Sequence, residues 1–258
     1  MQNKDVILEL KHVTKAFGGI TASNDINIEV PKKAIYGIIG PNGAGKTTLF
    51  NMITGVYDTT EGEIYFNNKK INGMSTDAIA SLGISRTFQN IRLFNSLTVY
   101  DNILTASQKN ISYSLLDGFF HTPKYRKQEK EMEEYCTELL EAVGLSQYKN
   151  QQASNLPYGL QRRLEIARAM ATRPEIILLD EPAAGMNEEE SARISEFIRS
   201  IRDDQNITII IIDHHMDVIM SLCDKISVLN FGQMIATGTA EEIQSNPDVI
   251  TAYLGVDE

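Results

Sequence analysis

A glycine-rich stretch, residues 40–48, carries the residue types that bind phosphate groups. It reads Gly40, Pro41, Asn42, Gly43, Ala44, Gly45, Lys46, Thr47 and Thr48, and it matches the pattern G-x-x-x-x-G-K-S/T at every fixed position. The glycines let backbone N–H groups surround a triphosphate, and the start of a following helix adds partial positive charge. The motif predicts Lys46 on the β- and γ-phosphates and the Thr47 hydroxyl on Mg²⁺. A plain glycine turn is the alternative, but the apolar strand predicted at 34–39 and the helix predicted at Thr48–Thr54 favour a nucleoside triphosphate site.

Two further groups of polar residues follow apolar runs that predict buried strands. Asp180 and Glu181 follow Ile176–Leu179, and His214 follows the run at 207–212. Because ligands gather at the carboxyl ends of parallel strands, we expect these groups to meet the phosphate loop. Asp180 is placed to hold Mg²⁺ through water, Glu181 to act as general base on the attacking water, and His214 to hydrogen-bond the γ-phosphate and Glu181. A solvated turn and a surface histidine pair are the alternatives, and for His215 we keep the surface interpretation.

Two weaker signals lie between these motifs. Gln89 follows a strand predicted at Ile84–Phe88, where a single glutamine is usually a solvent-facing amide. The segment Leu156–Gln161 is a turn that leads into an amphipathic helix, with basic residues close to its start. By itself this is a helix start with a basic first turn; because basic residues oppose the dipole there, they would be less unusual if that end faced a phosphate.

The elements that position these residues follow an α/β pattern. Strands alternate with helices, which indicates a parallel sheet with both faces covered. We expect an α/β core with an N-terminal sheet, interrupted by a helical insertion at about 90–165, in which 109–124 is the least patterned stretch. The remaining strands are predicted at Val6–Leu10, Ile26–Val30, Ile35–Ile39, Glu63–Phe66 and Ile226–Leu229, and the helices at Tyr125–Val143, Glu188–Arg202 and Met216–Cys223.

Composition narrows the classes of protein. The 258 residues are 42% hydrophobic and 22% charged, and the longest apolar run, near 207–212, is too short for a transmembrane helix. No signal peptide is visible, so we expect a cytoplasmic protein. The net charge of −10 argues against broad binding to nucleic acid or anionic lipid, so a protein partner would have to hold the chain at a membrane. Cys136 and Cys223 lack metal-ligand spacing and are expected to be reduced.

Together, these motifs resemble the ATP-binding subunits of ABC transporters over essentially the whole chain. The resemblance implies a P-loop NTPase core with an N-terminal antiparallel β-subdomain and an inserted α-helical subdomain, in one cassette spanning 1–258 (core 1–89 and 166–258, insertion 90–165). It implies that Phe17 stacks on adenine and that Gly159 and Leu160 contact the nucleotide of an opposite subunit. It also implies that Gln89 contacts Mg²⁺, with Thr47 and Asp180, and takes part in catalysis. The motifs are Walker A at Gly40–Thr48, the Q-loop at Gln89, the signature at Leu156–Gln161, Walker B at Ile176–Glu181, the D-loop at Ala183–Asn187 and the switch histidine His214.

Within the family, several stretches are similar to the branched-chain amino acid importer cassettes. They are Arg86–Phe94, Tyr158–Gly159, Ala183–Asn187 and Asn246–Gly255. This similarity implies hydrolysis of ATP with Mg²⁺, a second cassette as homo- or heterodimer, integral membrane permease subunits, an indirect link to a substrate-binding protein, no nucleic acid, and a position on the inner face of the cell membrane. A lipopolysaccharide-type exporter cassette, a soluble ABC switch protein and a nucleotide-binding module without turnover remain alternatives. The sequence does not encode the transported substrate.

The chain departs from the family pattern at the signature and the D-loop. Pro157, Tyr158 and Leu160 replace three residues of L-S-G-G-Q, and Asn187 replaces the usual aspartate. We interpret these changes as tuning, because the core catalytic residues are intact. The segment Ser114–Phe120 holds four large apolar residues, for which docking of a permease and capping of the helical subdomain are equally open.

Overall fold

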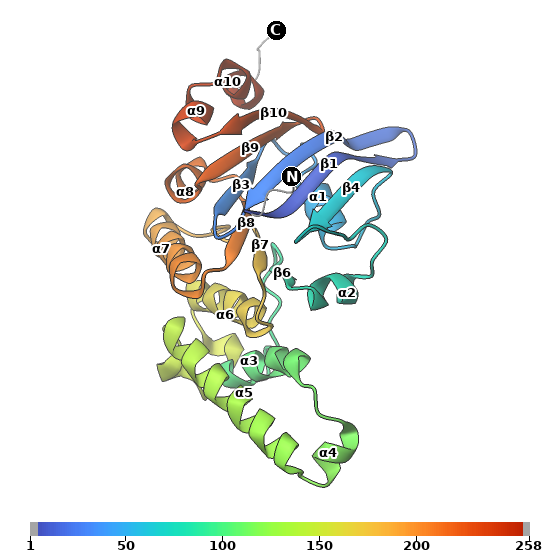
Figure 1. The fold of residues 1–258 in the computed structure, drawn as a ribbon. Helices are drawn as coiled ribbons and strands as arrows, with labels where there is room; N and C mark the ends of the chain where they lie inside the picture. The colour runs from blue at the N-terminus through green and yellow to red at the C-terminus, as the bar shows by residue number, and fades with distance from the viewer. Residues whose placement is uncertain (1–4, 255–258) are drawn as a thin grey trace. The chain divides into compact units, whose positions relative to one another are not determined.

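The computed structural model describes residues 5–254, which form two compact units (Figure 1). One unit contains the chain up to Gln89 and from Glu175 onward, and the other is Asn90–Pro174. Among the described residues, no helix is both long enough and apolar enough to cross a membrane.

The first unit is built on a six-stranded sheet in the order β10-β9-β3-β8-β7-β6. Neighbouring strands from β9 to β6 are parallel, and β10 is antiparallel to β9. Every residue of β3, β7 and β8 is buried, which explains why these strands read as unbroken apolar runs rather than as alternating ones. The strands are β3 (Ile35–Ile39), β6 (Ile84–Arg86), β7 (Ile176–Asp180), β8 (Thr208–Ile212), β9 (Lys225–Asn230) and β10 (Gln233–Gly238).

A second, antiparallel sheet in the same unit has the order β2-β1-β4-β5. Its strands are β1 (Val6–Phe17), β2 (Ile20–Pro31), β4 (Glu61–Phe66) and β5 (Lys69–Lys70). In β2, buried Ile26, Ile28 and Val30 alternate with exposed residues, as in a sheet with one face packed on the core. The predicted α/β core with an N-terminal antiparallel sheet is therefore confirmed.

The helices of this unit are α1 (Lys46–Ile53), α2 (Thr76–Ser81), α7 (Glu188–Gln205), α8 (Met216–Leu222), α9 (Ala240–Gln244) and α10 (Pro247–Leu254). Several predicted boundaries are wrong. The first two strands extend well beyond the predicted Val6–Leu10 and Ile26–Val30, and two further boundaries lie at the glycine loop and before Gln89. Helix α1 begins at Lys46 rather than Thr48, because Gly45 caps it in a left-handed conformation that ends the glycine loop. Strand β6 ends at Arg86 rather than Phe88, so Gln89 lies beyond the sheet.

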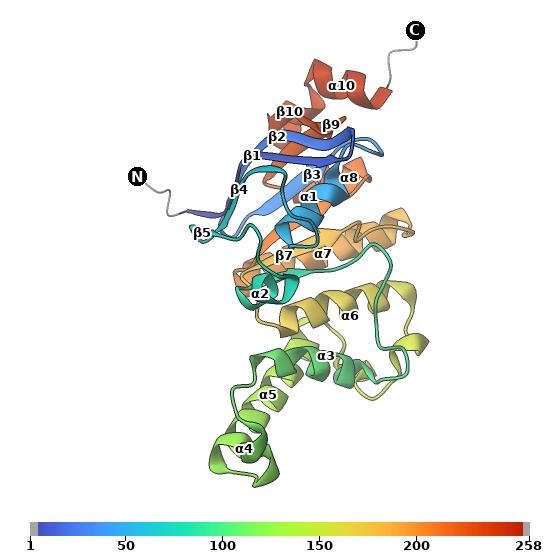
Figure 2. The same cartoon turned by 90° about the vertical axis from the view of Figure 1, so that its right-hand side faces the viewer.

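The second unit is helical and includes α3 (Val99–Ser107), α4 (Leu115–Phe119), α5 (Pro123–Ala142) and α6 (Tyr158–Ala171). Short 3₁₀ turns lie at Gln108–Asn110, Ser146–Tyr148 and Ala153–Asn155. Figure 2 shows α4 beside the start of α5. The stretch 109–124, expected to be the least patterned, contains α4, which Ser114 and Asp117 fix with a capping box.

Candidate functional site

The glycine loop joins β3 to α1 and is pressed against neighbouring backbone. A Cβ atom on Gly40 would lie 2.1 Å from the carbonyl oxygen of Leu229, and one on Gly45 would lie 2.3 Å from that of Ala22. Both glycines also have positive φ angles, 152° and 99°, so side chains are excluded on two grounds. The result is a tight backbone cradle of the kind that phosphate binding requires.

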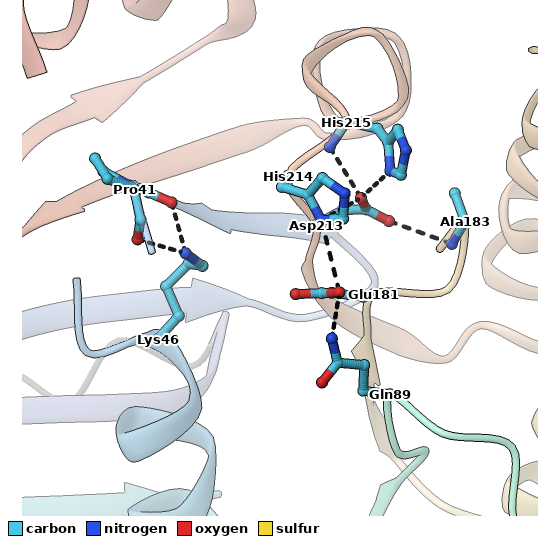
Figure 3. A network of polar contacts seen from close by, with 9 residues as sticks. Pro41, Lys46, Gln89, Glu181, Ala183, Asp213, His214 and His215 are labelled. Atoms are coloured by element: carbon cyan, nitrogen blue, oxygen red, sulfur yellow. Dashed lines mark hydrogen bonds and ion pairs between the residues drawn. The ribbon is translucent and has the colours of Figure 1, made fainter. Parts of the chain in front are cut away.

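Lys46 lies across this loop (Figure 3). Its Nζ donates hydrogen bonds to the carbonyl oxygens of Gly40 at 2.5 Å and Pro41 at 2.9 Å. Burial lowers the pKa of Lys46 below its ordinary value, while the nearby charges of Glu181 and Asp180 raise it. A phosphate at the loop would supply oxygens in place of these carbonyls and favour the charged amine.

The start of α1 offers backbone donors to the same position. No side chain caps this helix, because its N-cap residue is Gly45. The first N–H groups of a helix lack partners within the helix, so they point toward any ligand held in the loop. Thr47 is exposed in the first turn and Thr48 is half-buried. The loop therefore fits a phosphate chain.

Glu181 stands at the end of β7 in a backbone conformation that is uncommon for glutamate. Its φ is 48°, and its N–H donates to the carbonyl oxygen of Ile212 at the end of β8, at 2.7 Å. Its carboxylate accepts a hydrogen bond from Gln89 Nε2 at 2.8 Å and lies 3.6 Å from His214 Nδ1 (Figure 3). The structure therefore brings Glu181, Gln89 and His214 together; the strand pattern predicted that Glu181 and His214 meet, whereas Gln89 was assigned to the site only by the family resemblance. A carboxylate placed between an amide and an imidazole can accept a proton from water.

Asp213 and His215 form a second polar group beside His214. The Asp213 side chain is fully buried, with one oxygen 2.7 Å from His215 Nδ1 and the other accepting the N–H of Ala183 at 3.2 Å. The rings of His214 and His215 lie 4.2 Å apart. His215 is thus part of a paired network rather than a plain surface side chain, and Asp213 ties the loop of His214 to the backbone that follows Glu181. Sequence reasoning missed Asp213, although an aspartate two residues before a helix cap is a recognisable signal.

Asp180 is buried and paired with a residue that the sequence did not single out. Its carboxylate accepts a hydrogen bond from Arg86 at 2.7 Å, and the side chains are only 9% (Arg86) and 8% (Asp180) exposed. The signal available was indirect: a buried carboxylate requires a positive partner, and Arg86 ends the neighbouring strand β6.

Phe17 ends β1, 43% exposed, with its ring centroid 5.2 Å from that of Tyr57. It pairs with Ile20 in β2, and Ala22, two residues further along β2, is the residue that contacts Gly45. Phe17 therefore lies on the same β-hairpin as Ala22, the residue that borders the glycine loop. Its predicted stacking on adenine fits this position and stays a prediction.

The signature segment opens α6 in the helical unit. Pro157 is the N-cap residue, and its carbonyl oxygen accepts the N–H groups of Leu160 and Gln161, each at 3.0 Å. A Cβ on Gly159 would meet nothing within 4 Å, so the space beside this residue is open. The basic residue Arg162 does not serve the helix start, because it is fully buried and bonded to Glu165 at 2.7 Å. The expectation that the basic residues mark a phosphate-facing end is therefore wrong for Arg162.

The residues present fit Mg²⁺ as well as nucleotide. Magnesium prefers oxygen ligands, and the candidates supply the Asp180 carboxylate, the Thr47 hydroxyl and the Gln89 amide oxygen. Gln89 directs its amide nitrogen toward Glu181, and an amide also carries an oxygen of the kind that magnesium prefers. The two cysteines are free thiols, and burial raises the pKa of both, so they are packing residues.

Comparisons with known proteins agree on one family. Residues 23–184 match the model of the ABC transporter family, and residues 233–258 match that of branched-chain amino acid ATP-binding cassette transporters. The chain is 47% identical to the high-affinity branched-chain amino acid transport ATP-binding protein BraF of Pseudomonas aeruginosa and 45% identical to LivG of Escherichia coli K12. In each case the match covers 96% of this chain and 98% of the relative.

The fold agrees with solved cassettes as well. The crystal structure of the ADP conformation of MJ1267, an ATP-binding cassette of an ABC transporter, superposes with a TM-score of 0.84 at 34% identity, covering 97% of this chain and 99% of that one. A nucleotide-free ATP-binding cassette from an ABC transporter gives a TM-score of 0.83 with 97% and 100% coverage.

Proposed function

Because the chain belongs to the ABC transporter family of ATP-binding cassettes, we propose that it is the ATP-hydrolysing subunit of an importer for branched-chain amino acids. Cassettes of this family are ATPases coupled to transport. The amino acid specificity is supported by the relatives BraF and LivG and by the match of residues 233–258. The same match favours import over the exporter alternative.

One observation carries the hydrolytic part of the proposal: the Glu181 carboxylate lies 2.8 Å from Gln89 Nε2 and 3.6 Å from His214 Nδ1. In this arrangement Glu181 takes a proton from the attacking water, while Gln89 and His214 orient the carboxylate and the water. Lys46 and the loop amides stabilise the charge on the phosphates. Bound Mg²⁺, held by Asp180, Thr47 and Gln89, would supply Lewis-acid stabilisation of the same charge.

The proposed assembly contains a second cassette, identical to this chain or a sister of it. Each nucleotide would then contact the glycine loop of one subunit and the signature backbone at Gly159 and Leu160 of the other. An ADP-bound dimer is known for the ATP-binding cassette MJ0796, which is 25% identical to this chain. Integral membrane permease subunits hold the pair on the inner face of the cell membrane, and a substrate-binding protein delivers the amino acid.

The experiment reconstitutes the chain in liposomes together with the proposed permease subunits and substrate-binding protein. We expect uptake of labelled leucine with ATP inside the liposomes and none with ADP. Hydrolysis that is insensitive to leucine, isoleucine and valine but stimulated by another solute would refute the substrate class. Absence of any hydrolysis by the assembled complex would refute the ATPase role.

A further inference from the structure

Arg86 is bonded to Asp180 in a closed, largely buried environment. One guanidinium nitrogen donates to the Asp180 carboxylate at 2.7 Å, and another donates to Asn51 Oδ1 on α1, also at 2.7 Å. Its carbon Cζ lies 5.4 Å from the ring centroids of both Phe50 and Phe88. The side chain is therefore fixed by an acid, an amide and two aromatic rings.

The partners of Arg86 belong to different parts of the nucleotide site. Asn51 and Phe50 lie on α1, which opens with Lys46 and Thr47. Asp180 ends β7, and Phe88 immediately precedes Gln89. One arginine thus links the helix behind the glycine loop, the acid predicted to hold the metal, and the segment of Gln89.

A buried carboxylate needs hydrogen-bond donors or a partner of opposite charge, and Arg86 provides both for Asp180. Mg²⁺ with its bound water is a second candidate for the same carboxylate. Arg86 uses one oxygen of the Asp180 carboxylate, at 2.7 Å, and a second cation at the other oxygen would be repelled by the guanidinium across the same carboxylate. Binding of the metal must therefore weaken the arginine contact.

We propose that Arg86 is the resident counter-ion of Asp180 and yields this carboxylate to Mg²⁺ when the metal–nucleotide complex binds, so that Arg86 sets the magnesium dependence of nucleotide binding. The proposal rests on the proposed function in taking Asp180 as a metal-site residue. Arg86 acts through Asp180 and is a positioning residue. Phe88 packs on Arg86 and immediately precedes Gln89. Release of Asp180 by Arg86 therefore also changes the packing next to Gln89.

The test measures binding of a fluorescent ADP analogue to the full-length chain, once with Mg²⁺ and once with EDTA. In Arg86→Met the metal no longer displaces an arginine, so the Kd with Mg²⁺ falls. Without metal, the uncompensated Asp180 repels the phosphates, so the Kd in EDTA rises. We expect the Kd in EDTA divided by the Kd with Mg²⁺ to increase on the order of tenfold. This is the change that the loss of one charged hydrogen bond produces. A ratio within about twofold of wild type, or an equal change in both Kd values, would overturn the proposal.

Three further variants sharpen the result. Arg202→Met removes a different arginine–carboxylate pair of the same unit, with Asp224 at 2.9 Å, and should leave the ratio unchanged. In an Asp180→Asn background, Arg86→Met should no longer alter the ratio, and a persisting effect would show that Arg86 acts elsewhere. If Arg86→Met does not fold, Arg86→Lys is the alternative variant. It replaces the planar guanidinium, which has several donors, by a single ammonium group that holds Asp180 less firmly, and it must also raise the ratio.

The outcome is separable from that of the proposed function. Because ADP binding requires no turnover, an unchanged ratio would remove the role of Arg86 and leave the ATPase intact. Failure of the wild-type chain to bind ADP at all would instead contradict the nucleotide site.

Discussion

Replacement of Glu181 by glutamine isolates the proton-accepting role from every structural one. Glutamine has nearly the same size, and its amide oxygen can still accept the hydrogen bond from Gln89 Nε2. The backbone at this position, with φ at 48°, costs about the same for either residue. We therefore expect an unchanged fold and unchanged affinity for ATP.

The effect on turnover is large because the amide cannot take up a proton. General bases contribute on the order of 10²–10⁴ in rate, so Glu181→Gln should lower turnover by about 10²-fold or more. That loss corresponds to about 2.7 kcal/mol or more in the barrier. His214, which lies 3.6 Å from the carboxylate and is half-exposed, is not positioned to replace it at full efficiency.

Phosphate release at saturating ATP measures this loss, and size-exclusion chromatography with ATP detects the dimer that should accumulate when hydrolysis is blocked. Glu188→Gln is the matched control, because it removes the same charge from an exposed position seven residues further along the chain. Turnover of Glu181→Gln within threefold of this control would refute the assignment of the base.

Three other outcomes follow from the described contacts. Phe119 and Phe120 are 77% and 69% exposed, which favours docking of the permease over capping of the helical subdomain. Changing both to serine should therefore abolish co-purification with the permease at an unchanged melting temperature. A lower melting temperature with intact co-purification would instead support the capping role. In the Glu181→Gln background, Gly159→Asp should abolish ATP-driven dimerisation, because it places a carboxylate against the γ-phosphate bound by the other subunit. Pro157→Ser should change dimerisation only modestly. Dimerisation of Gly159→Asp would exclude a nucleotide site shared between the glycine loop of one subunit and the signature segment of the other. Because burial lowers the pKa of Lys46 and phosphate favours its charged form, binding takes up a proton, so nucleotide affinity should fall as pH rises through that lowered pKa; a flat profile of Kd against alkaline pH would contradict this.

The parts of the site that could be predicted from the sequence are those that local rules determine. The glycine loop is contiguous, and its backbone conformation requires glycine at Gly40 and Gly45. Asp180, Glu181 and His214 follow strands that are buried on both faces, and such strands are visible as apolar runs. The meeting of these groups then follows from parallel pairing of β3, β7 and β8.

The parts that could not be predicted depend on contacts between distant positions. Arg86 and Asp180 are 94 residues apart, and only the pairing of β6 with β7 brings them together. The role of Asp213 depends on the N–H of Ala183, 30 residues earlier, which no local pattern reveals. Helix α4 was missed for a different reason: five residues are too few to show a helical period, and the capping box of Ser114 and Asp117 was its only local sign.

Asn187 stands where the family usually has an aspartate, and the structure shows that asparagine can do the same structural work at this position. Asn187 is the N-cap of α7: its side chain accepts the N–H of Glu190 at 2.9 Å, and the Glu190 carboxylate accepts the N–H of Asn187 at 3.2 Å. Asparagine and aspartate cap helices about equally well, so the start of α7 is retained. The first turn already carries Glu188, Glu189 and Glu190, and a fourth negative charge there would oppose them. The neutral cap therefore preserves the geometry after Glu181 while reducing repulsion within the turn, which is consistent with tuning of the site rather than its loss.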